Sequence, residues 1–303
     1  MTRRATPEAL DDLATEAWDA SAAELDRRST AELVSLMNDE DARVPAAVGA
    51  ARDALAAAID AVAGRLREGG RLVYVGAGTS GRLAAVDAAE CEATFGVAPE
   101  IVVAVVAGMD GGAAIEQAAE DDREAGERAV QELDVGERDA VVGLSASGRT
   151  PFTCAALESA RAAGATTIAV VSVAGSELTS FAEHEILVPV GPEVIAGSTR
   201  LKAGTAQKLV LNTISTVAMI RLGKTFGNLM VDVVATNDKL RSRVRRIVAT
   251  ATGASDERVD AALAEADGDA KVAIVALAAD VDTATARSRL AAAGGVVRDA
   301  LDR

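Results

Sequence analysis

Two loops rich in glycine and hydroxyl side chains have the composition of phosphate-binding loops. The first, Gly76-Ala77-Gly78-Thr79-Ser80-Gly81-Arg82, follows a short β-branched run and precedes a helical pattern. The second, Ser145-Ala146-Ser147-Gly148-Arg149-Thr150-Pro151, follows a later run, with Pro151 near the first position of a helix. Free amides at a helix start, together with hydroxyl groups, bind phosphate. We therefore expect an anionic ligand contacted by Gly78, Thr79, Ser80, Ser145, Ser147 and Thr150.

The first loop alone does not identify the ligand. Its glycines have the spacing Gly76-x-Gly78-x-x-Gly81, which matches a dinucleotide-binding loop. However, the next β-branched run ends in Ala107-Gly108 instead of an acidic residue, and Thr79-Ser80 adds hydroxyl groups where a dinucleotide loop requires bare backbone. These two differences favour a phosphate ligand without a nucleotide.

A third polar stretch precedes a long apolar segment that runs from about Arg200 to Leu222. Ser198 and Thr199 suit a helix cap, which is the simpler interpretation of this stretch. Lys202 could instead bring positive charge to an anionic ligand. We therefore add Ser198 and Lys202 to the expected phosphate contacts.

A regular alternation of strands and helices positions these loops. Strands alternating with helices predict an α/β fold with a doubly wound parallel sheet, and five strands fit the flavodoxin-like order 2-1-3-4-5. In that order strands 1 and 3 are neighbours, so both loops converge on one crevice at the carboxyl edge of the sheet. The five expected strands are Leu72–Val75, Ile101–Val106, Ala140–Leu144, Thr167–Val173 and Ile186–Val190, and helices are expected near 80–90, 112–132, 151–163 and 176–183.

We expect three parts along the chain: an N-terminal arm and short helix (1–45), the α/β domain (46–250) and a small C-terminal helical bundle (251–303). In the first part, Ser29 and Glu32 have the spacing of a capping box, which predicts a short helix that ends near Met37. The bundle is expected to contain helical segments at Asp256–Ala266, Ala270–Ala279 and Thr283–Leu301. The segment around Leu209–Ile220 is apolar nearly all round, which is typical of a buried helix. We therefore expect a homodimer that covers part of it.

Composition excludes several classes of function. The 303-residue chain is half hydrophobic and carries a formal net charge of −15, which argues against a nucleic-acid partner. Two cysteines and the single His184 make neither a disulfide framework nor a zinc site, so no metal and no cofactor is expected. No apolar run is long enough to span a bilayer, and no leader is visible, so we expect a cytoplasmic protein without a membrane partner.

Several motifs together resemble the N-acetylmuramic acid 6-phosphate etherases, which carry sugar isomerase (SIS) domains. The similarity runs from about Ser21 to the end of the chain, and its motifs are Val75–Leu83, Ala89-Glu90-Cys91, Gly148–Pro151, Lys202–Lys208 and Phe226–Val233. The resemblance implies a homodimeric SIS fold. It also implies cleavage of the D-lactyl ether to give N-acetylglucosamine 6-phosphate and D-lactate, as part of amino-sugar metabolism and peptidoglycan recycling.

The resemblance implies two catalytic glutamates, which map to Glu90 and to Glu120. At the second position the register is shifted by one residue, and Glu116 lies one helical turn upstream as an alternative base. The chain departs from the family pattern at Trp18-Asp19-Ala20, at Glu92-Ala93 and at Met109, which bears on substrate range.

Two carboxylates without a metal suit an elimination. Once the sugar ring opens to an aldehyde, the proton on C2 is acidic, and one carboxylate can remove it while a carboxylic acid protonates the departing lactate oxygen. We assign Glu120 as the C2 base and Glu90 as the acid, which later activates water for addition at C3. A sugar-phosphate isomerase and a non-catalytic sugar-phosphate regulator are the alternatives.

Overall fold

The chain forms two compact units. A computed structural model describes residues 15–18, 24–109, 117–233 and 238–302. The first unit comprises Met1–Ala88 and Glu100–Ser215, and the second comprises Ala89–Pro99 and Thr216–Arg303.

The first unit is built on the expected parallel sheet. Its five strands lie in the order β2-β1-β3-β4-β5, and every neighbouring pair is parallel, so the predicted order is confirmed. Every residue of β1, β3 and β4 is buried, as expected for strands covered on both faces. The strands are β1 (Leu72–Gly76), β2 (Val102–Val106), β3 (Ala140–Leu144), β4 (Thr166–Val171) and β5 (His184–Leu187).

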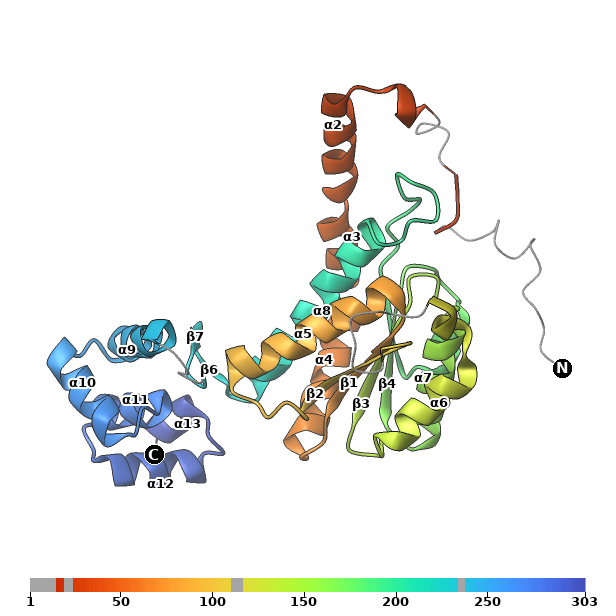
Figure 1. The fold of residues 1–303 in the computed structure, drawn as a ribbon. Helices are drawn as coiled ribbons and strands as arrows, with labels where there is room; N and C mark the ends of the chain where they lie inside the picture. The colour runs from red at the N-terminus through yellow and green to blue at the C-terminus, as the bar shows by residue number, and fades with distance from the viewer. Residues whose placement is uncertain (1–14, 19–23, 110–116, 234–237, 303) are drawn as a thin grey trace. The chain divides into compact units, whose positions relative to one another are not determined.

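Helices cover both faces of the sheet (Figure 1). Alternate residues of β1 point to opposite faces: Val73 and Val75 join the apolar cluster formed with α6 and α7, whereas Tyr74 donates a hydrogen bond to Asp87 of α5 at 2.9 Å. The helices after β1 and β3 therefore leave the sheet on opposite sides. The helices are α4 (Arg52–Arg67), α5 (Gly78–Phe95), α6 (Arg123–Glu132), α7 (Pro151–Ala162) and α8 (Lys202–Arg221), with short 3-10 helices η3 (Gln117–Asp121) and η4 (Glu177–Phe181).

The N-terminal part contains the expected capping box. Ser29 accepts a hydrogen bond from the amide of Glu32, whose carboxylate accepts one from the amide of Ser29. The helix that they start, α2 (Thr30–Asp41), runs four residues beyond the expected end at Met37. It follows the 3-10 helix η2 (Leu25–Arg27) and precedes α3 (Val44–Ala50), which is separated from α4 at Ala51.

Several element boundaries differ from those expected. The segment 112–132 was predicted as one helix, but its described part contains η3 and then α6, because the side chain of Asp122 caps the amide of Ala125 and starts a new helix. β5 begins at His184 and ends at Leu187, two to three residues earlier than its apolar run suggested.

The second unit is a helical bundle with a small β-ribbon, and its described residues share one apolar core. The long helix expected from Thr283 is two helices, because Gly294 and Gly295 adopt positive φ angles that end the first. Apart from Ala89–Pro99, this unit comprises Thr216–Arg303, whereas the expected bundle begins at residue 251; Val231, Val244 and Val248 belong to the core of the unit. Its elements are β6 (Thr225–Phe226), β7 (Leu229–Met230), α9 (Asp238–Thr252), α10 (Asp256–Glu265), α11 (Ala270–Ala279), α12 (Thr283–Ala292) and α13 (Val297–Leu301).

The apolar helix α8 is largely covered by its own chain. Val210, Leu211, Ile214 and Met219 are at most 1% exposed, while Ile220 is 46% exposed. Intrachain packing therefore accounts for most of the apolar surface that suggested a dimer. Among the helices that the structure describes, none combines the length and the apolar character needed to cross a bilayer.

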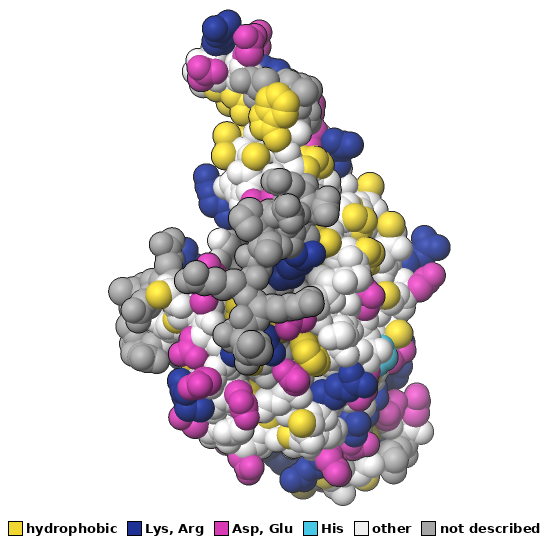
Figure 2. Space-filling model, turned by 90° about the vertical axis from the view of Figure 1, so that its right-hand side faces the viewer, with side chains coloured by type: hydrophobic (Ala, Val, Ile, Leu, Met, Phe, Trp, Pro, Cys, Tyr) yellow, Lys and Arg dark blue, Asp and Glu magenta, His cyan; other side chains and the backbone are white. Residues whose placement is uncertain are grey.

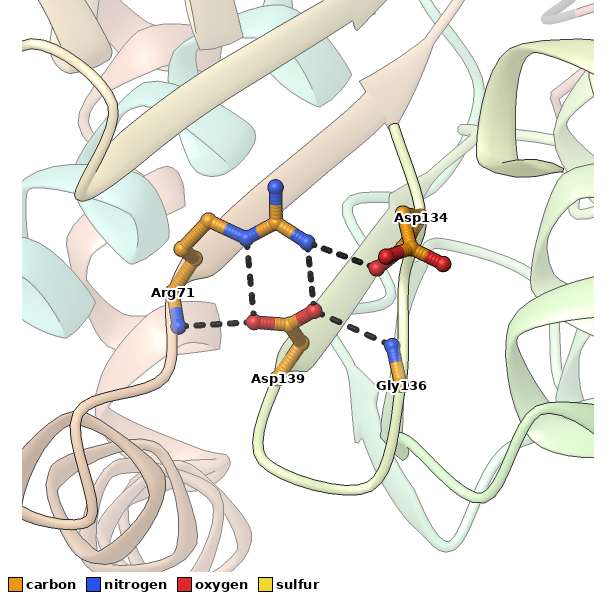
Figure 3. A network of polar contacts seen from close by, with 4 residues as sticks. All are labelled: Arg71, Asp134, Gly136 and Asp139. Atoms are coloured by element: carbon orange, nitrogen blue, oxygen red, sulfur yellow. Dashed lines mark hydrogen bonds and ion pairs between the residues drawn. The ribbon is translucent and has the colours of Figure 1, made fainter. Parts of the chain in front are cut away.

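A polar network at the amino edge of the sheet ties the start of β1 to the start of β3 (Figure 3). The guanidinium of Arg71 donates to both carboxylate oxygens of Asp139, at 3.1 and 2.7 Å, and the amides of Arg71 and Gly136 donate to the same carboxylate. Burial alone would raise the pKa of Asp139, but the hydrogen bonds from Arg71 and Gly136 outweigh it, and the pKa is lowered. The ionised carboxylate is therefore the form that stabilises the fold.

Replacing this carboxylate should destabilise the protein by an amount that depends on pH. We expect Asp139→Asn to lower the free energy of unfolding by about 2 kcal/mol at pH 7, because it loses charge-assisted hydrogen bonds. Since the folded pKa lies below the ordinary value, this contribution is complete above that value and is lost as pH falls through the folded pKa.

Urea unfolding at pH 7 and at pH 3 measures the difference. Asp134→Asn is the matched control, because Asp134 contacts Arg71 through its backbone carbonyl (Figure 3). A deficit in Asp139→Asn that stays the same down to pH 3 would contradict this account.

Candidate active site

A crevice of about 400 Å³ lies at the carboxyl edge of the sheet, within the first unit. The loops after β1 and β3 line it, as the strand order predicts for two neighbouring strands whose helices leave on opposite faces. The structure therefore brings together six of the expected phosphate contacts. The lining residues are Glu16, Ala77, Gly78, Thr79, Ser80, Glu120, Asp121, Ser145, Ala146, Ser147, Arg149, Thr150, Pro151 and Thr199.

The loop after β3 is held by its own hydroxyl groups. Ser145 is buried, and its Oγ accepts from the amide of Gly148 at 3.0 Å and lies 2.9 Å from Oγ1 of Thr150. Ser147 Oγ accepts from the amide of Arg149 at 3.3 Å. The side chain of Thr150 makes no capping bond at the start of α7, so amides of the first turn are available to an anion.

Gly148 is required by the shape of this loop. Its φ of +65° lies in the left-handed region, and a Cβ at this position would lie 2.0 Å from Oγ of Ser176. Only glycine fits both conditions. The close approach also brings the carbonyl of Gly148 to the amide of Leu178, at 2.9 Å, which fixes the loop against η4.

The loop after β1 also depends on a glycine, whose missing side chain allows close packing against the sheet. A Cβ on Gly81 would lie 2.6 Å from Val106 of β2 and 2.7 Å from the carbonyl of Gly76, so the first turn of α5 lies directly against the sheet. A Cβ on Gly204 of α8 would lie 3.5 Å from the side chain of Thr79. These contacts place Thr79 and Ser80 at the rim of the crevice.

Glu120 reaches the crevice from η3. Its carboxylate Oε2 is 3.9 Å from the position of a Cβ on Gly78, so the expected base lies beside the loop after β1. Helix α7 contacts η3, and Gly126 allows α6 to approach the backbone of Phe152 in α7. The alternative base, Glu116, lies outside the described residues.

Glu90 lies on the second half of α5, in the part of that helix that belongs to the second unit. Its side chain is exposed, while its neighbour Cys91 is buried and 2% exposed. The described crevice is lined by residues of the first unit, so Glu90 is not among them.

Burial raises the pKa of the other cysteine, Cys154, to about 12, so its thiol is protonated and is no nucleophile at neutral pH.

Lys202 does not line the crevice. It is 2% exposed, and its ammonium group forms an ion pair with the carboxylate of Glu40 in α2. The carboxylate of Glu193 accepts from the amides of Lys202 and Ala203, at 3.0 and 2.9 Å, and caps α8. Ser198 is also absent from the lining, whereas its neighbour Thr199 is present.

Sequence reasoning missed four polar lining residues: Glu16, Asp121, Arg149 and Thr199. Arg149 carries the one positive charge among the described residues that line the crevice, against the carboxylates of Glu16, Glu120 and Asp121. Arg149 and Thr199 are each adjacent in sequence to an expected phosphate contact, Thr150 and Ser198. The sequence does not reveal which side chain of each pair lines the crevice, because this depends on the folded conformation of the loop. Glu16 is in the N-terminal arm, far from either loop in sequence.

A larger cavity, of about 640 Å³, lies at the opposite edge of the sheet and is lined by the Arg71–Asp139 network. In its lining the guanidinium of Arg71 and the carboxylate of Asp139 bind each other, so this pair supports the fold (Figure 3). His184, at the start of β5, also lies at this amino edge. Among the described residues, no three side chains of His, Cys, Asp or Glu form a group that could hold a metal ion.

Charge on the surface is mixed. Figure 2 shows Lys and Arg side chains interspersed with Asp and Glu over the displayed face, with no extended basic region there. This distribution gives no support to a nucleic-acid interface on that face.

Comparisons with known proteins agree with this geometry. A SIS domain matches residues 39–172. The fold is also similar to a phosphoheptose isomerase structure from Francisella tularensis, with a TM-score of 0.51 and 18% identity over 64% of this chain and all of that chain.

Relatives extend over nearly the whole chain. N-acetylmuramic acid 6-phosphate etherases are 57% identical in Rubrobacter xylanophilus (97% of each chain), 53% identical in Streptomyces coelicolor (96% of this chain, 94% of the relative) and 48% identical in Escherichia coli (97% and 99%). With this identity over this length, the chain belongs to the N-acetylmuramic acid 6-phosphate etherase family.

Proposed function

We propose that this protein cleaves the D-lactyl ether of N-acetylmuramic acid 6-phosphate, giving N-acetylglucosamine 6-phosphate and D-lactate by elimination followed by hydration. The observation that carries the proposal is the crevice in which Glu120 lies beside two hydroxyl-rich loops at helix starts. Family membership over nearly the full chain supports the substrate. The reaction belongs to amino-sugar metabolism, and we propose peptidoglycan recycling as its setting.

The phosphate binds at the loop after β3. Ser145, Ser147 and Thr150 supply hydroxyl groups, and the start of α7 supplies amides and the positive end of the helix dipole. Arg149 adds the positive charge that a phosphate dianion needs in a crevice that also contains three carboxylates. Ser80 and Thr79 complete the site from the loop after β1.

Glu120 then removes the C2 proton of the open-chain aldehyde, and the electron pair expels the lactate oxygen from C3. Glu90 protonates that oxygen and afterwards activates the water that adds to C3 of the unsaturated aldehyde. Glu90 belongs to the second unit, so this assignment rests on the Ala89-Glu90-Cys91 motif. No step requires a metal or a nucleotide.

We also propose that the active form is a homodimer in the cytoplasm. Large apolar side chains that are exposed in the first unit support a partner surface there: Trp18, Val34, Val86 and Ile195. Light scattering over a range of protein concentrations measures the oligomeric state.

The test of the function is release of D-lactate from N-acetylmuramic acid 6-phosphate. We expect Glu120→Gln and Glu90→Gln each to lower turnover by roughly a hundredfold or more, because each loses a general acid or base, while the product sugar phosphate still binds. Glu124→Gln, an exposed substitution on α6, is the control for Glu120. Normal turnover in Glu120→Gln would move the base elsewhere.

A pair of glycine variants tests the phosphate loop. Gly148 and Gly175 have nearly the same φ, +65° and +64°, so an alanine at either position pays the cost of the left-handed conformation, about 1 kcal/mol. Only at Gly148 would the methyl group meet Ser176; at Gly175 no atom lies within 4 Å. We expect Gly148→Ala to weaken binding of N-acetylglucosamine 6-phosphate strongly and Gly175→Ala to leave it intact, as measured by calorimetry. Equal affinity in the two variants would show that the loop after β3 does not bind the phosphate.

A further inference from the structure

The elimination requires an open-chain sugar, and ring opening itself requires a proton acceptor. A proton must leave the hydroxyl group on C1 while the bond between C1 and the ring oxygen breaks. His184, the chain's one histidine, lies at the opposite edge of the sheet from the crevice. Among the residues that the structure describes, the acceptor is therefore sought in the carboxylates that line the crevice.

Glu16 enters the crevice from a different part of the chain than Glu120 and Asp121, which are consecutive residues of η3. Its carboxylate Oε2 lies 2.8 Å from where a Cβ on Gly197 would be, so bare backbone at Gly197 makes room for it. Its neighbour Thr15 is 2% exposed, so the arm is anchored at this point. Gly197 and Thr199 belong to one loop, and Thr199 also lines the crevice.

We propose that Glu16 is a catalytic residue that opens the sugar ring, an assignment that rests on the proposed function. Its carboxylate removes the proton from the C1 hydroxyl group. The C1 oxygen forms a double bond to C1, the bond from C1 to the ring oxygen breaks with its electron pair on that oxygen, and Glu16 returns the proton to it. The step is balanced without any other reactant and leaves Glu120 free for the C2 proton.

The experiment separates ring opening from the chemistry at C2 and C3. N-acetylglucosamine 6-phosphate interconverts its two anomers only through the open chain, and magnetisation-transfer NMR measures the rate of this exchange. We expect the unmodified protein and Glu120→Gln to accelerate the exchange. Glu16→Gln should lower the acceleration by roughly a hundredfold, as expected for loss of a general base. Glu16→Gln should also slow D-lactate release while its affinity for the sugar phosphate is unchanged.

Glu24→Gln is the matched control, since Glu24 belongs to the same N-terminal part, is exposed and pairs with Arg27. It should retain both anomer exchange and lactate release. Undiminished exchange in Glu16→Gln, no acceleration by the unmodified protein, or selective loss of exchange in Asp121→Asn would each overturn the role of Glu16. Absence of lactate release from the unmodified protein would instead overturn the proposed function and, with it, this role.

Discussion

The site depends on one constraint of the sheet: β1 and β3 are parallel neighbours, but the helices that follow them leave on opposite faces. Their connecting loops must separate at the carboxyl edge, and a crevice remains between them. Two glycines determine the conformation of these loops. Gly81 allows α5 to pack against the sheet, and Gly148 turns the backbone so that Oγ of Ser145 accepts a hydrogen bond from its amide. The hydroxyl groups and helix starts face the same space as a result.

Most of the first unit could be predicted from local patterns. Buried parallel strands are short β-branched runs, and these runs located all five strands and their order. Two predicted helices were too long, because the apolar pattern continues past a residue that interrupts the helix. These interruptions are the helix cap at Asp122 and the positive φ angles of Gly294 and Gly295. The expected boundary at residues 250 and 251 differs from the division into compact units, because that division depends on which apolar residues share a core, and Val231 and Val244 carry no mark of that in sequence.

The two loops of the site could be predicted from the sequence. The positions of residues far from these loops in sequence could not. Hydroxyl residues after two neighbouring strands had to meet, because the strand order brings them together. The ammonium of Lys202 is bound by Glu40, a residue 162 positions away, so its charge is directed to α2 and not to the crevice. Glu16 lines the crevice, although no periodicity in the sequence links it to the two loops. In each case the deciding contact is long-range.

The central claim, elimination and rehydration at C3, is tested most directly by reaction in oxygen-18 water. Elimination breaks the bond between C3 of the sugar and the ether oxygen, so that oxygen leaves with the lactate. We predict that mass spectrometry will find the label in the C3 hydroxyl group of N-acetylglucosamine 6-phosphate and none in the hydroxyl group of D-lactate. Label in the lactate hydroxyl would mean that water attacks the lactyl carbon, and it would contradict the roles of Glu120 and Glu90.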